Sequence, residues 1–133
     1  MAGRIAVGVE YDGSGFAGWQ WQPGKRTVQA ELEAALSRVA NQEIRVICAG
    51  RTDSGVHATA QVVHFDTDVF RRPHSWMMGA NSVLPPDVRV TWVQEVDDAF
   101  HARTSAIARF YRYEILNRPV RSALQSKQLT WVF

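Results

Sequence analysis

The side chain best suited to chemistry is that of Asp53, within the stretch Ala49-Gly50-Arg51-Thr52-Asp53-Ser54-Gly55-Val56-His57-Ala58. Glycines on both sides of Asp53 permit backbone conformations that other residues resist, so this loop can present a carboxylate to a ligand. Arg51 and His57 are near in sequence, and an arginine within reach favours the ionised carboxylate. Asp53 is therefore our candidate for a nucleophile or base rather than a protonated acid.

The same residues also suit an ordinary turn. In such a turn the aspartate caps its own backbone and a glycine supplies a positive φ, which is sufficient to explain Asp-Ser-Gly alone. A turn, however, needs neither an arginine two residues before its aspartate nor the strand-like run Gln61-Val62-Val63-His64-Phe65 soon after it. The longer pattern favours a functional loop.

A second segment of interest is Tyr11-Asp12-Gly13-Ser14-Gly15-Phe16-Ala17-Gly18-Trp19-Gln20-Trp21-Gln22, which mixes aromatic residues with glycines and amides. Aromatic rings on a loop can stack on unpaired bases, and the amides of Gln20 and Gln22 could contact base edges. An equally good interpretation is an entry loop whose Trp19 fills the core.

A third segment is Phe100-His101-Ala102-Arg103, followed by Ala108-Arg109-Phe110-Tyr111-Arg112-Tyr113. On a strand, Tyr111 and Tyr113 would share one face. A tyrosine in a strand is more often packed than catalytic, so spacing alone assigns no role to Tyr111.

Together the three segments resemble the TruA family of transfer-RNA pseudouridine synthases. The family's catalytic loop reads Ala-Gly-Arg-Thr-Asp-Ala-Gly-Val-His and is followed by a strand like Gln-Val-Val-His-Phe. Its members open with Tyr-Asp-Gly…Phe…Gly-Trp-Gln and later carry Phe-His-Ala-Arg…Tyr-Arg-Tyr. In the catalytic loop only Ser54 departs from the pattern, where an alanine is common. One small residue replaces another there, so the resemblance stands.

The resemblance implies an isomerase that converts uridine to pseudouridine in the anticodon stem-loop of tRNA. It implies that Asp53 is catalytic, that Tyr111 packs against the target uracil, and that Arg51 helps to flip the target nucleotide. Arg103 would be a basic residue near the RNA. It further implies no cofactor and no metal, and a homodimer in which one tRNA touches both subunits.

Family members are about twice as long as this chain. We therefore expect residues 1–117 to be the N-terminal catalytic half-domain, and residues 118–133 to lead toward a C-terminal half. In the family that second half supplies a basic residue that pairs with the catalytic aspartate. Residues 1–133 alone are accordingly expected to show weak or no activity.

Composition predicts one soluble domain with a substantial core, since 46% of the 133 residues are hydrophobic and 21% are charged. The net charge is +2, and among the 15 basic residues only Lys25 and Lys127 are lysines. Arginine suits phosphate and base recognition because its guanidinium is a planar fork of donors. A GC-rich genome would produce the same bias.

A single cysteine, Cys48, excludes a disulfide framework and is best explained as a buried strand residue. The spacing of His57, His64, His74 and His101 matches no compact metal-ligand set, so we expect structural or RNA-facing roles for them. Without a leader peptide or an apolar run near the ~20 residues of a membrane span, we expect a cytoplasmic protein with no membrane partner.

Hydrophobic periodicity predicts an α+β sandwich similar to ferredoxin-like and RNA-recognition (RRM-like) folds, with helices on one face of a mostly antiparallel sheet. The expected strands are Ile5–Tyr11, Ile44–Ala49, Thr59–Phe65, one that alternates Val88, Val90 and Trp92, and Ile107–Leu116; the expected helices run from Thr27 to Asn41 and over 72–83. We expect the Asp53 loop to interrupt a strand that then continues. The second sheet face should remain uncovered, available to nucleic acid or to a partner domain or subunit.

Two other functions fit parts of the sequence. Asp-Ser-Gly is also the triplet of aspartic proteases, but such a hydrolase would be all-β and would need two carboxylates sharing a proton. A non-catalytic RNA-binding module of the same fold would use the sheet and the arginines without any reaction.

Overall fold

The computed structural model describes residues 3–103 of the chain. These residues form four strands and two α-helices, with a short 3-10 turn after the first strand. In chain order the elements are β1 (Gly3–Tyr11), η1 (Gly13–Gly15), α1 (Val28–Ala40), β2 (Ile47–Cys48), β3 (Ala58–Thr67), α2 (Pro73–Val83) and β4 (Val88–Val96).

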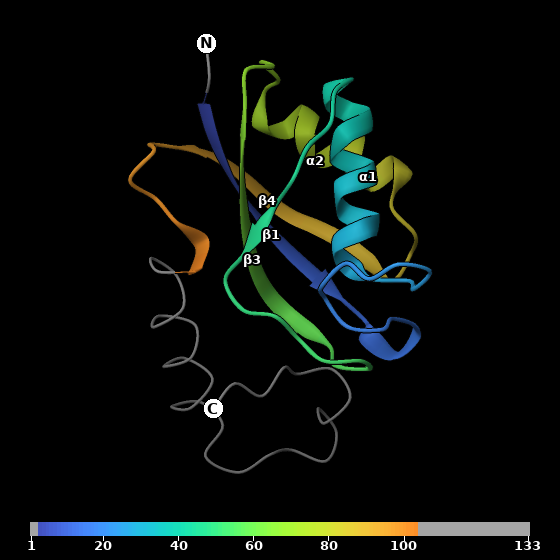
Figure 1. Cartoon of the computed structure of the whole chain (residues 1–133). Helices are drawn as coiled ribbons and strands as arrows, with labels where there is room; N and C mark the ends of the chain where they lie inside the picture. Colours follow the sequence, from blue (N-terminus) through green and yellow to red (C-terminus); the bar gives the residue numbers. More distant parts are fainter. Residues whose placement is uncertain (1–2, 104–133) are drawn as a thin grey trace.

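The strands form one sheet in the order β2-β3-β1-β4, and all neighbouring strands are antiparallel. Both helices lie on one side of this sheet (Figure 1). The predicted α+β sandwich is confirmed, and the strand order is the one that a ferredoxin-like chain produces when each helix follows a strand on the same face.

Helix α1 has the ends that its sequence predicts. Thr27 is the N-cap, and its side chain accepts a hydrogen bond from the backbone N–H of Ala30. Asn41 ends the helix in the left-handed conformation, with φ 55°. The buried stripe of the helix consists of Val28, Leu32, Ala35, Leu36 and Ala40.

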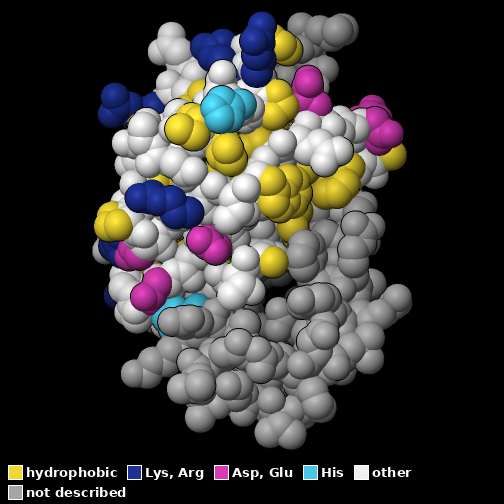
Figure 2. Space-filling model, turned by 180° about the vertical axis from the view of Figure 1, so that it is seen from behind, with side chains coloured by type: hydrophobic (Ala, Val, Ile, Leu, Met, Phe, Trp, Pro, Cys, Tyr) yellow, Lys and Arg dark blue, Asp and Glu magenta, His cyan; other side chains and the backbone are white. Residues whose placement is uncertain are grey.

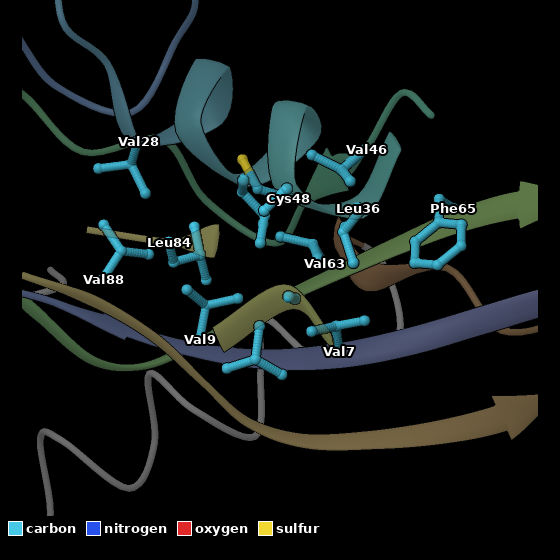
Figure 3. Packing of buried hydrophobic residues seen from close by; sticks show 14 of the residues in the cluster. Val7, Val9, Val28, Leu36, Val46, Cys48, Val63, Phe65, Leu84 and Val88 are labelled. Atoms are coloured by element: carbon cyan, nitrogen blue, oxygen red, sulfur yellow. The ribbon is translucent and has the colours of Figure 1, made fainter. Parts of the chain in front are cut away.

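The main core fills the space between the sheet and the helices (Figure 3). Alternate residues of β1 and β3, among them Val7 and Phe65, point into it. Trp76 of α2 is fully buried and meets Phe65 edge-on, with ring centroids 5.1 Å apart. Burial of each such side chain contributes about 1.5–3 kcal/mol, which makes the sheet a rigid support for the loops at its ends.

The prediction that one strand continues through the Asp53 loop is wrong. β2 and β3 are antiparallel neighbours, with Cys48 paired to Val63, so the loop between them reverses the chain. The expected strand at 44–49 is also reduced to β2 alone. Side chains of α1 bind the backbone N–H groups of the residues just before β2, which are then not available to a neighbouring strand. Ser37 Oγ accepts from Ile44 N–H at 2.8 Å, and Glu33 Oε2 accepts from Val46 N–H at 2.9 Å.

The alternation predicted for β4 also breaks. Val9 pairs with Val90 but Gly8 pairs with Trp92, so Thr91 forms a bulge and Trp92 changes face. The Trp92 ring lies so close over Gly8 that a Cβ there would overlap it. Trp92 is 40% exposed, and the molecule seen from behind shows hydrophobic side chains gathered near its middle (Figure 2).

The second sheet face was expected to be uncovered, but part of it is covered. After β4 the chain returns across it, and Ala102 is completely buried against Ala49 and Val62. Val62 belongs to the face opposite Val63, because successive residues of a strand alternate. In Figure 1 this returning segment, drawn in orange, lies on the side of the sheet away from the helices.

Several predictions fall on residues that the structure does not describe. These are Tyr111, the strand Ile107–Leu116 and the boundary between residues 117 and 118. Among residues 3–103, no helix is long and apolar enough to cross a membrane.

Candidate active site

The Asp53 loop, residues 49–57, is fastened to the sheet near its start. Gln61 on β3 donates from Nε2 to the carbonyl of Gly50 at 2.6 Å. The backbone N–H of Ala49 donates to the carbonyl of Val62 at 2.8 Å. The loop therefore leaves the sheet in a fixed direction.

The middle of the loop is held by the segment that follows β1. Thr52 accepts at its carbonyl from the backbone N–H of Trp19 at 3.0 Å. The carbonyl of Phe16 accepts from the N–H of Gly55 at 3.2 Å and from Ser54 Oγ at 3.2 Å. Two segments that are about 35 residues apart in sequence thus form one unit around Asp53.

Two glycines make this close approach possible. A Cβ on Gly13 would overlap the carbonyl of Val56, and a Cβ on Gly18 would lie 2.8 Å from the carbonyl of Thr52. Gly18 also has φ +89°, a conformation that other residues rarely adopt. The glycines after β1 are therefore required by the packing of the loop.

The side chain of Tyr11, at the end of β1, is hydrogen-bonded to the Asp53 loop. Its hydroxyl lies 2.8 Å from Thr52 Oγ1, and Gln61 Nε2 lies 3.4 Å from the same hydroxyl. Burial raises the pKa of Tyr11 above its ordinary value, although both hydrogen bonds act in the opposite direction. The phenol is therefore neutral near pH 7 and available for hydrogen bonding rather than for proton transfer.

Asp53 itself is exposed, while its loop is fixed on both sides. Its carbonyl accepts from the N–H of Val56 at 3.1 Å, which closes a turn around it. The sequence suggested Arg51 as a nearby partner of Asp53. Within the described part of the chain, the two residues form no ion pair. Hydrogen bonds thus fix the backbone of Asp53, while its side chain is exposed to solvent.

His57 links the end of the loop to η1. Its Nδ1 accepts from the backbone N–H of Gly13 at 2.9 Å, which places the proton of the neutral ring on Nε2. Asp12 Oδ1 lies 3.0 Å from the same nitrogen and becomes its ion-pair partner only when the ring is protonated. His57 thus has a structural contact of the kind expected for it.

A hollow of about 290 Å³ lies beside this end of the loop. Its lining consists of Glu10, Tyr11, Asp12, His57, Ala58, Thr59, Pro86, Asp87 and Arg89.

The aromatic segment combines both interpretations that its sequence allowed. Phe16 and Trp19 are buried in the core, so Trp19 does fill it. Trp21 is 54% exposed, and its neighbours Gln20 and Gln22 are exposed as well. Trp21 is therefore the aromatic side chain of this loop that is available to stack on a base.

Arg51 lies in the Asp53 loop, and Arg103 follows a residue that packs against the start of that loop. Burial raises the pKa of the Cys48 thiol, and the charges of Arg103 and Arg51 both oppose that rise. Ala102, next to Arg103, packs against Ala49 near the start of the loop. Both guanidinium groups belong to exposed residues.

Comparison with known proteins decides the family. A family model described as tRNA pseudouridine synthase matches residues 7–105, which is more than half of the chain. The chain belongs to the tRNA pseudouridine synthase family. The TruA resemblance seen in the sequence is thereby confirmed, and the aspartic-protease alternative is excluded by the family and by the α+β fold.

Several tRNA pseudouridine synthases A are similar to the chain. That of Methylococcus capsulatus is 69% identical over 128 residues, which cover 96% of this chain and 47% of that protein. That of Nitrosococcus oceani is 62% identical, covering 96% and 49%, and that of Paracidovorax citrulli is 55% identical, covering 98% and 47%. The chain thus spans about half the length of the curated relatives it matches.

Sequence reasoning named Asp53, Arg51 and Arg103 as candidate site residues but missed the residues that hold the Asp53 loop in place. Gly13, Gly18 and Gln61 belong to the sequence patterns described above, which assign no role to them. The signal was present, because glycines beside aromatic residues and an amide in a buried strand are both unusual. Among residues 3–103, no group of three or more His, Cys, Asp or Glu side chains could hold a metal ion.

Proposed function

We propose that this protein isomerises uridine to pseudouridine in the anticodon stem-loop of tRNA, with Asp53 as its one reactive carboxylate. The observation that carries the proposal is an exposed aspartate at the centre of a loop held from both sides. Gln61 fixes the start of the loop, and Trp19 fixes its middle. A fixed backbone with a free carboxylate is the arrangement that preorganised catalysis requires.

The reaction breaks the bond between N1 of uracil and C1′ of the ribose, turns the base and rejoins it through C5. Positive, oxocarbenium-like charge develops on the sugar when the bond breaks, and a nearby carboxylate stabilises that charge. Asp53 could form a covalent bond to C1′, or remove the 2′ proton to give a glycal. Both routes need the ionised carboxylate and no cofactor.

The target uridine must leave its stack before it can react, at a cost of a few kcal/mol. We assign this step to Arg51, and the contact with neighbouring RNA to Arg103. Tyr111, outside the described residues, would pack on the detached uracil and keep water away from it. The cluster that joins Ala102, the residue before Arg103, to Ala49 at the start of the Asp53 loop supports this assignment.

We further propose the organisation that the family implies. Residues 1–117 would be the N-terminal catalytic half-domain, and residues 118–133 would connect it to a second half. The protein would act in the cytoplasm as a homodimer on tRNA. The half-length match to relatives supports the two-half arrangement.

The test is Asp53→Asn in the full-length protein, assayed for pseudouridine in unmodified tRNA and for tRNA binding. We expect turnover to fall by at least about 1,000-fold, roughly 4 kcal/mol of transition-state stabilisation, with binding retained. Asp68→Asn is the matched control: it is an exposed carboxylate at the far end of β3, roughly 30 Å away along the strand, and should behave as wild type.

Two results would contradict the proposal. If Asp53→Asn keeps wild-type turnover, the reactive group lies elsewhere. If the full-length wild type binds tRNA but forms no pseudouridine, the protein is a non-catalytic RNA-binding module.

A further inference from the structure

We propose that His64 is a positioning residue, whose neutral imidazole holds the segment Phe100–Arg103 on the sheet so that Arg103 is kept beside the Asp53 loop. This inference rests on the proposed function for its meaning, because Arg103 is taken to contact RNA. It assigns a role to a buried histidine that the reaction itself does not use.

The central contact is a hydrogen bond from the backbone N–H of Ala102 to His64 Nδ1, at 3.0 Å and buried. His64 is 1% exposed and Ala102 is fully buried, so water cannot replace either partner. A buried amide without an acceptor costs about 1–3 kcal/mol, and a ring that accepts at Nδ1 must carry its proton on Nε2. The contact therefore requires neutral His64.

Arg4 provides a second anchor for the same segment. Its Nη1 donates to the carbonyl of Phe100 at 2.6 Å and to that of Asp98 at 3.1 Å. The guanidinium is itself held by Asp66 through two contacts of 2.8 and 3.0 Å. Arg4 fixes the start of the segment, and His64 fixes its end.

The ring of His64 also packs against the segment that it holds. Its centroid lies 6.2 Å from that of Phe100 and 4.7 Å from that of His101, both edge-on. Both ring contacts, like the hydrogen bond to Ala102, come from the returning segment. Three successive residues, Phe100, His101 and Ala102, thus contact this one histidine ring.

The segment leads directly to the site. Ala102 packs in one cluster with Ala49 and Val62, and Ala49 begins the Asp53 loop. Arg103 follows Ala102 and is exposed. Displacing Ala102 would therefore move Arg103 and loosen the packing beneath the loop.

The charged and titratable groups that face His64 are Arg4 on β1, Asp66 on β3 and His101 on the returning segment. Burial, then Arg4 and His101, hold the pKa of His64 below its ordinary value, while Asp66 acts in the opposite direction. The neutral form thus prevails at pH 7. The contribution of this hydrogen bond is fully present above the ordinary pKa of histidine and is lost as pH falls through the lowered value in the folded protein.

The experiment compares His64→Leu with His64→Asn in the full-length protein, each with and without Arg103→Ala. Leucine removes the acceptor, whereas the amide oxygen of asparagine can take the place of Nδ1 without titrating near neutral pH. The readouts are the dissociation constant for unmodified tRNA and the pseudouridine formed.

We expect His64→Leu to weaken tRNA binding about tenfold, a change of about 1.4 kcal/mol, and Arg103→Ala to do the same. In the Arg103→Ala background, His64→Leu should weaken binding by less than about twofold, because the two changes remove one interaction. His64→Asn should bind tRNA as wild type at pH 7, and should lose less affinity than wild type as the pH is lowered.

The proposal is overturned if His64→Leu binds tRNA as tightly as wild type, or if it causes the same loss with and without Arg103. If His64→Leu does not fold, hydrogen exchange of the Ala102 amide in the wild type decides instead. Slow exchange supports the proposal, and exchange as fast as in exposed loops overturns it. Because these readouts measure binding and protection, they remain informative even if the wild type makes no pseudouridine.

Discussion

Asp53 is exposed on a loop whose position depends on two glycines of the segment after β1. Gly13 and Gly18 let the segment after β1 approach the backbone carbonyls of Val56 and Thr52. A side chain at either glycine would meet backbone, which cannot move aside as a flexible side chain can. At the scale of single residues, the position of the carboxylate is therefore set by the absence of two Cβ atoms.

Gly13→Ala tests this dependence. We expect the free energy of unfolding to fall by roughly 1–3 kcal/mol, because the new methyl group overlaps the carbonyl of Val56, and we expect pseudouridine formation to fall with it. Urea unfolding and the tRNA assay measure the two effects. Gly3→Ala is the matched control, since a Cβ at Gly3 meets nothing within 4 Å. Equal behaviour of the two variants would show that the approach of Gly13 is unimportant.

At the scale of elements, hydrogen bonds join the end of β1 to the Asp53 loop. Tyr11, the last residue of β1, contacts Thr52 through its hydroxyl, directly beside Asp53. Gln61 of β3 reaches both this hydroxyl and the carbonyl of Gly50. The two central strands thus contact the loop at two residues: β3 binds Gly50 and β1 binds Thr52.

A double-mutant cycle of Tyr11→Phe and Thr52→Val tests this coupling. Each change removes one hydroxyl of the same 2.8 Å hydrogen bond and should lower the free energy of unfolding by about 1 kcal/mol. The double variant should be less destabilised than the sum, because both changes break one bond. Chemical denaturation of the four proteins supplies the numbers, and simple additivity would mean that the two hydroxyl groups act separately.

At the scale of the whole molecule, the half-length match to relatives is the dominant fact. Asp53 forms no ion pair within residues 3–103, although a carboxylate that works in its ionised form benefits from a cationic partner. We propose that a second half supplies this partner.

We therefore expect residues 1–133 alone to form little or no pseudouridine in tRNA, even when circular dichroism and a cooperative unfolding transition show that they are folded. The full-length protein, assayed side by side, should be active. Brisk turnover by residues 1–133 would show that no second half is needed.

The sequence by itself determined the family, the α+β class and the ends of α1, and it singled out Asp53 as the candidate reactive group. These are local signals: a catalytic motif, capping residues and a hydrophobic period lie within short stretches of chain. Prediction from local sequence failed where a contact with another element decided the outcome. The strand expected at 44–49 shrank to β2 because Ser37 and Glu33 take its donors.

Only the tertiary structure decided how the loop is held and how part of the second sheet face is covered. Gly13 meets Val56, and His64 meets Ala102, across 38 or more residues of sequence. These partners meet only because the folded sheet brings together the segments that leave its strands, and the local sequence around one partner does not indicate the other. The physical reason is that hydrogen bonding and packing depend on distance in space, whereas the periodicities read from a sequence report only which face of an element a residue occupies.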